Sequence, residues 1–111
     1  MLIEEKAFEE EVGKNAINFF INMHVIRDYS RDLNPRDYWD DDEAAQLIVD
    51  KMPEAMWVGR VDCFDGMSWG AGYDMYSQTG DEINKNKSRA ICIALLRALC
   101  RIESGELVLK E

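Results

Sequence analysis

The sequence predicts an α+β fold in which a small antiparallel β-sheet is layered between helices. Three segments carry apolar residues at helical spacing, at about 4–25, 42–52 and 88–102. A fourth segment, at about 56–76, alternates between two faces around a turn dipeptide, as a β-hairpin does. Because 111 residues suffice for one hydrophobic core, we expect a single domain over 1–111.

The first predicted helix repeats its apolar residues on one face. Its acids Glu9, Glu10 and Glu11 lie nearer the N-terminal end, where negative charge suits the helix dipole. Gly13 weakens this helix, and we expect it to continue through that position. The stripe consists of Phe8, Val12, Ala16, Phe19, Phe20 and Met23.

The stretch "RDYSRDLNPRDYW" alternates charges with aromatic residues and contains the turn dipeptide Asn34-Pro35. We expect a loop that lays Tyr29, Tyr38 and Trp39 onto the body. Loops of this length often carry function. Tyr38 and Trp39 therefore have two interpretations, packing and contact with a partner.

The four acids Asp40, Asp41, Asp42 and Glu43 directly precede the second helical stripe. Asp40 or Asp41 can cap the free N–H groups of this helix, and the next acids fall in its first turn. A helix start therefore explains the cluster, and a partner-binding surface is the alternative. A divalent metal is disfavoured because calcium loops space their acids around a glycine.

The hairpin is predicted by "MWVGRVDCFDGMSWGAGYDMY", in which Asp65-Gly66 is a favoured two-residue turn. Gly70 and Gly72 leave one face of the second strand bare. Bare glycines indicate a close approach of backbone, or a flat face for a partner. Trp69 and Tyr73 share the opposite face of that strand.

The C-terminal third predicts an exposed loop at 77–87 and then the central buried helix. Ser88 caps this helix, which runs through Arg101 and stops at Ser104-Gly105. The tail "ELVLKE" can add an edge strand. Three cysteines without a CxxC pair predict small core residues in a reducing compartment, and these are Cys63, Cys92 and Cys100.

The formal net charge is −9 and is unevenly spread. Residues 1–82 hold 19 acids and 7 bases, a net −12, whereas residues 83–111 hold 3 acids and 6 bases, a net +3. This charge disfavours nucleic acid as a partner and suits a protein with a basic surface. A solvated surface that aids solubility is the alternative. The acidic start and the lack of a long apolar run predict no signal peptide, no membrane contact and a cytoplasmic location.

Several short pieces resemble the phage ABA sandwich family of small phage and prophage proteins. They are "DYSRD", "EAAQLIVDKM", the strand ending in "DG", "SWGAGY" and "SRAICIALLRAL", and together they cover roughly 15–102. The insertion "LNPRDYWDDD" and an N-terminal helix without tryptophan depart from the family pattern. The resemblance implies a helix–sheet–helix layer fold and a phage or prophage origin. It implies no catalytic residues.

Catalytic chemistry finds little support in the sequence. His24 is the single histidine and has no Ser or Cys close to it in sequence, and no nucleophile, zinc or phosphate-binding motif is present. We therefore expect no enzyme, no cofactor and no metal. The enzymatic alternative is a small metal enzyme in which Asp62, Asp65 and Asp74 converge on Mg²⁺.

The function that we expect from the sequence is protein binding. The sharper hypothesis is a phage-encoded, anti-CRISPR-like inhibitor whose acids imitate nucleic-acid phosphates in a groove of a host defence protein. The predicted contacts are the acids Glu9, Glu10, Glu11, Asp37, Asp40, Asp41, Asp42 and Glu43, with the loop aromatics Tyr38 and Trp39. The alternative is a self-associating phage accessory or structural protein, a homodimer that buries Trp57, Trp69 and Tyr73.

Overall fold

The computed structural model describes residues 3–31, 33–63, 66–73 and 82–110, and it confirms the α+β class. The described strands form a three-stranded antiparallel sheet in the order β1-β2-β3 and a two-stranded sheet β4-β5. The elements in chain order are α1 (Ile3–Ala7), η1 (Phe8–Val12), α2 (Lys14–Ile21), η2 (Asn22–Ile26), η3 (Tyr29–Arg31), α3 (Asp42–Lys51), β1 (Met56–Cys63), β2 (Gly66–Tyr73), β3 (Glu82–Asn84), α4 (Lys87–Leu99), β4 (Cys100–Glu103) and β5 (Glu106–Leu109).

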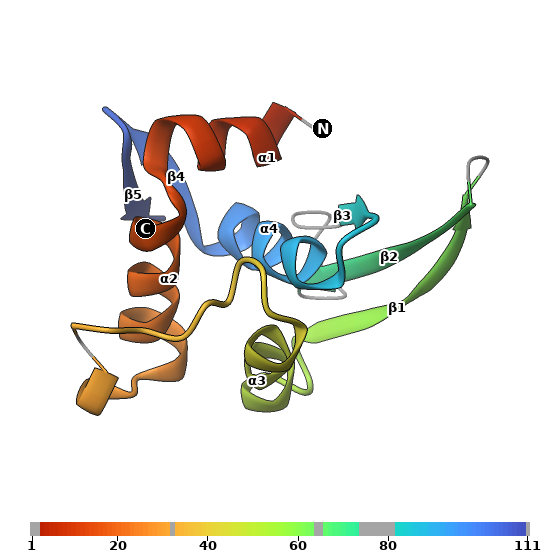
Figure 1. Ribbon diagram of the computed structural model, residues 1–111, viewed down its shortest axis with the longest axis horizontal. Helices are drawn as coiled ribbons and strands as arrows, with labels where there is room; N and C mark the ends of the chain where they lie inside the picture. Colours follow the sequence, from red (N-terminus) through yellow and green to blue (C-terminus); the bar gives the residue numbers. More distant parts are fainter. Residues whose placement is uncertain (1–2, 32, 64–65, 74–81, 111) are drawn as a thin grey trace.

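Helix α4 is the centre of the molecule, as its nearly continuous apolar sequence predicts. Every residue from 90 to 96 is completely buried. Strands β2 and β3 pack against this helix, and α3 contacts it as well. In Figure 1, α1 lies above α4 and α3 lies below it. The hydrophobic core therefore surrounds one helix, and the three-stranded sheet is one of its walls.

The N-terminal segment is broken at Gly13, so the expectation of one continuous helix is wrong. Gly13 has φ 92° and ψ 149°, a backbone conformation that disfavours side chains with a Cβ. A π-helical turn, η1, ends there, with the Gly13 N–H donating to the Phe8 carbonyl at 2.8 Å. Figure 1 shows α1 and α2 running in different directions. The break lets Phe8 and Ile17 both reach the core.

The predicted hairpin is confirmed, with its turn one residue earlier than expected. Cys63 pairs with Gly66, so Gly66 belongs to β2 and the connection consists of residues 64–65. Residues 64–65 and 74–81 lie outside the described part of the chain. Met56 and Ala71 are buried on the face that carries Trp69 and Tyr73, the side of the sheet that joins the core.

Helix α4 ends at Leu99, so the expected end at Ser104-Gly105 is wrong. Those two residues instead join β4 to β5, with φ 52° and 77°, the pair of positive φ values typical of a tight hairpin turn. The tail does form a strand, β5, which pairs with β4. The expected exposed loop at 77–87 contains a further strand, β3, in its described part.

The β1–β2 hairpin projects from the body as an arm. Figure 1 shows both strands extending well past the end of α4. This projection fits the elongated dimensions of 40 × 28 × 27 Å. Within the described residues, no helix has the length and apolar character needed to cross a bilayer.

Candidate functional site

Three of the eight predicted surface acids, Glu9, Asp37 and Asp40, belong to an internal ion-pair network, which we name the Arg89 seam. Arg89 of α4 donates to Glu5 at 2.7 Å and to Asp40 at 2.8 and 3.0 Å, and it also pairs with Glu9. Lys14 of α2 contacts Asp37 at 2.8 Å and Asp40 at 3.0 Å. The seam thus ties the N-terminal helices and the loop before α3 to the central helix. Its members are Glu5, Glu9, Lys14, Asp37, Asp40 and Arg89.

The seam holds its groups in their charged forms. Burial tends to raise the pKa of Asp40, but the hydrogen bonds from Arg89 and Lys14 outweigh it and hold this pKa below its ordinary value. The hydrogen bonds that the Lys14 ammonium donates to Asp37 and Asp40 raise the pKa of Lys14. Burial likewise opposes the charge on Arg89, and the carboxylates of Glu5 and Asp40 raise its pKa against that effect. These carboxylates are satisfied within the chain and have little left to offer a partner.

Tyr38 and Trp39 lie in the core beneath the seam, so the packing interpretation holds and neither ring has surface to offer a partner. Their exposed fractions are 0% and 1%. The Trp39 indole N–H donates to Glu9 at 3.2 Å, and its backbone N–H donates to Asn18 at 3.1 Å. The Arg89 guanidinium lies 5.5 Å from the Trp39 ring centroid. By contrast, Tyr29 is exposed.

Asp41 and Asp42 start helix α3, as the sequence predicts. Asp41 is the N-cap residue, and its carboxylate accepts from the Glu43 N–H at 3.0 Å. Asp42 accepts from the Ser88 N–H at 3.2 Å and thereby joins α3 to α4. The Ser88 hydroxyl, completely buried, lies 2.9 Å from the Trp39 carbonyl oxygen. Helix α4 begins at Lys87 with Asn86 at the N-cap position, so the expected cap by Ser88 is wrong.

The remaining predicted acids are exposed, and they fall into two groups. Glu10 and Glu11 lie on η1, while Glu43 lies in the first turn of α3. Glu43 borders a hollow of about 340 Å³, which we name the α3 hollow. Leu47, 37% exposed, forms its apolar wall. The lining residues are Arg36, Asp37, Asp41, Glu43, Ala44 and Leu47.

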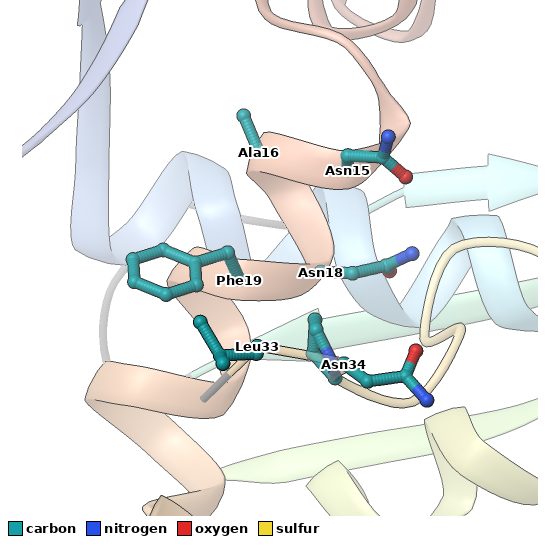
Figure 2. A pocket seen from close by; sticks show the side chains of 7 residues that line it. Asn15, Ala16, Asn18, Phe19, Leu33 and Asn34 are labelled. Carbon is teal, nitrogen blue, oxygen red and sulfur yellow. The ribbon is translucent and has the colours of Figure 1, made fainter. Parts of the chain in front are cut away.

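A second hollow, of about 550 Å³, opens between α2 and the loop at 33–35. Figure 2 shows Phe19 and Leu33 on one side of it and the amides of Asn15, Asn18 and Asn34 on the other. The Asn18 amide is already engaged, because it donates to Asp37 and accepts from Trp39. None of the described residues that line this hollow has a titratable or nucleophilic side chain, and they offer apolar and amide contacts.

Of the three aspartates proposed for metal chemistry, the structure describes only Asp62, so their convergence stays a prediction. Asp62 pairs with Met67 and shares its face, while Asp65 and Asp74 lie outside the described residues. Among the described residues, no three His, Cys, Asp or Glu side chains gather as a metal site would require. His24 is exposed, with its ring 4.6 Å from that of Phe20.

Cys92 and Cys100 are free and buried, as expected of core cysteines. Burial raises the pKa of Cys92 well above its ordinary value and that of Cys100 to about 11, so neither is an activated thiol. Cys63 ends β1. Comparison with family models, with curated proteins and with solved structures finds no match.

Sequence reasoning missed three members of the seam, Glu5, Lys14 and Arg89. The available signal was Arg89, which stands among the apolar residues of the central helix. An arginine that is largely withdrawn from water, with its side chain 23% exposed, needs carboxylate partners. That requirement points to the surplus of acids nearer the N-terminus.

Proposed function

We propose that the protein is a small acidic interaction protein that binds a basic surface of another protein through the α3 hollow. The observation that carries this proposal is that Asp41 and Glu43 line one hollow with the partly exposed Leu47, and no ion pair joins either acid to another described residue. A lysine or arginine of the partner can lay its aliphatic stem on Leu47 and Ala44. Its charged head then reaches the two carboxylates.

The partner class in this proposal is a host protein with a nucleic-acid-binding surface, and the consequence is inhibition. The net charge of −9 supports electrostatic attraction to such a surface, which mainly accelerates association and favours specificity. The contact set is narrower than the full list of acids expected from the sequence. Neutralising an acid of the Arg89 seam removes fold stability together with charge, so such variants are poor probes of binding.

The test is a nuclease-treated pull-down from bacterial host lysate with three baits. The native chain is compared with Glu43→Gln/Leu47→Ser, which alters the α3 hollow. The matched control is Glu106→Gln/Leu109→Ser, which removes one exposed acid and one leucine of similar exposure, 43% against 37%, from β5. We expect one basic protein to be retained by the native and control baits and lost by the hollow variant.

Salt dependence tests the electrostatic part of the proposal on the same captured protein. Surface charges interact over about 10 Å at 0.1 M salt and about 3 Å at 1 M. We therefore expect the captured protein to elute as the salt concentration rises through this range. Capture that resists high salt, or that both double variants reduce equally, contradicts binding through the α3 hollow.

A further inference from the structure

Strand β1 has an open edge. It is eight residues long, and among the described strands it pairs only with β2. Natural proteins protect long edge strands, because unpaired N–H and C=O groups accept another strand. The β3 strand at the other edge of this sheet has only three residues. The open edge of β1 is therefore the longer and more available one.

The hairpin geometry decides which residues of β1 face outward. Residues flanking a two-residue turn form a hydrogen-bonded pair, and such pairs alternate along an antiparallel ladder. Since Cys63 pairs with Gly66, odd-numbered residues of β1 bond to β2, and Val58, Arg60 and Asp62 direct their backbone groups outward. Met56, another even-numbered residue, fits this alternation, because its N–H donates to the Met52 carbonyl and not to β2.

Two of these residues, Arg60 and Asp62, carry opposite charges, so this edge of one copy can complement the same edge of a second copy. Two copies of β1, paired antiparallel about a two-fold axis at Val61, place each Arg60 opposite the Asp62 of the other copy. Both side chains are exposed in the single chain. An axis at Arg60 or at Asp62 instead places like charges opposite each other, which is unfavourable.

In this register residues 59–63 of each copy lie opposite the same residues of the other, and Val61 is the apolar residue at the axis. Trp57, 40% exposed, and Val61 lie over Gly70 of β2. A Cβ on Gly70 would lie 2.8 Å from Val61 Cγ2 and 3.0 Å from the Trp57 ring, so the bare glycine lets both side chains lie close to the strand. With the axis at Val61, the two Val61 side chains face each other and join two such strips into one.

We propose that two copies of this chain associate through β1, antiparallel and in this register. The two three-stranded sheets then form one continuous sheet of six strands. This proposal gives self-association a specific register. It does not depend on the α3 hollow, so a result against one proposal does not contradict the other. It also does not require Trp69 or Tyr73, which pack against the core of their own chain.

Charge reversal with exchange of partners tests the register. Sedimentation equilibrium should show the native chain as a concentration-dependent dimer. Arg60→Asp and Asp62→Arg each place like charges opposite each other, and we expect each to raise the dimer dissociation constant about 10-fold or more. An equimolar mixture of the two variants pairs opposite charges again, so it should dimerise close to native strength.

Two controls separate this register from a general charge effect or a folding defect. The double variant Arg60→Asp/Asp62→Arg keeps self-complementarity and should dimerise, whereas Glu106→Arg, at an exposed site on β5 in the other sheet, should leave association unchanged. The proposal is overturned by a native chain that stays monomeric at the highest concentration. It is equally overturned by a dimer indifferent to both reversals, or by a mixture that does not recover.

Discussion

The Arg89 seam and the β1–β2 arm use the same kinds of residue in opposite ways. In the seam, Arg89 has three carboxylate partners and Trp39 is 1% exposed. In the arm, Arg60 and Asp62 are exposed, Trp57 is 40% exposed, and no other described strand covers one edge of β1. The seam has its interactions satisfied within one chain, whereas the arm leaves charged side chains exposed to solvent.

This contrast shows that the sequence alone does not tell whether an acid is paired within the fold or exposed on the surface. Asp40 and Asp62 are the same residue type in an acidic part of the chain, yet Asp40 accepts hydrogen bonds from Arg89 and ion-pairs with Lys14. The basic residues that pair with Asp40 lie far away in sequence, one on each side of it. Paired carboxylates contribute to stability, and free ones remain available for association.

Replacing a tryptophan in each region should give the largest difference between them. Trp39→Ala removes a fully buried ring and leaves Glu9 without its indole partner, so we expect a loss of about 4 kcal/mol in the free energy of unfolding. Trp57→Ala should cost about 1 kcal/mol, because that ring is already partly hydrated. Urea unfolding followed by circular dichroism measures both. Equal losses would remove the distinction between seam and arm.

Replacing one arginine in each region should give the next largest difference in the free energy of unfolding. Arg89→Met keeps a stem over Trp39 but leaves Glu5, 8% exposed in its side chain, without its cation. We expect a loss of about 2–3 kcal/mol, since breaking a largely buried pair leaves an uncompensated charge. Arg60→Met loses only an exposed cation near the Trp69 ring and should change stability by about 0.5 kcal/mol. A seam variant as stable as the arm variant would mean that the network is no more than a surface salt bridge.

The arm was more predictable from the sequence than the seam. The alternation from Met56 to Tyr73 and the Asp65-Gly66 signal are local, so the hairpin followed from neighbouring residues, with an error of one residue in its turn. The start of α3 was also local, because an N-cap side chain bonds within its own first turn. The continuous apolar run of α4 likewise identified the central helix.

The Arg89 pairs of the seam join residues far apart along the chain, 49 residues for Asp40 and 84 for Glu5. No spacing rule predicts such pairs from one sequence. The break at Gly13 was missed for a related reason: the apolar stripe runs through it, and tertiary packing decides whether a glycine bends a helix or stays in it. Ser104-Gly105 was misassigned because the same dipeptide can end a helix or turn a hairpin.

The two glycines of the arm offer a matched pair for the next prediction. A Cβ on Gly70 would meet Val61 and Trp57, whereas a Cβ on Gly59 would meet no atom within 4 Å. We expect Gly70→Ala to cost about 1–2 kcal/mol through the displacement of those side chains. Gly59→Ala should be neutral or stabilising by about 0.5 kcal/mol, because it restricts the unfolded chain. Thermal melting at low protein concentration compares the two variants without a contribution from association.

The last prediction makes the same substitution in both regions and varies the pH. Asp40 has a lowered pKa in the folded chain, so its ion pairs stabilise the fold above the ordinary carboxyl pKa, and this stabilisation is lost as the pH falls through the folded value. We expect Asp40→Asn to cost about 1 kcal/mol at neutral pH, a modest value because the side chain is one-third exposed. The cost should shrink toward zero below about pH 4. Asp62→Asn should change the free energy of unfolding by less than about 0.5 kcal/mol at either pH. Its effect should appear in the dimer dissociation constant instead, which assigns one aspartate to the fold and the other to the interface.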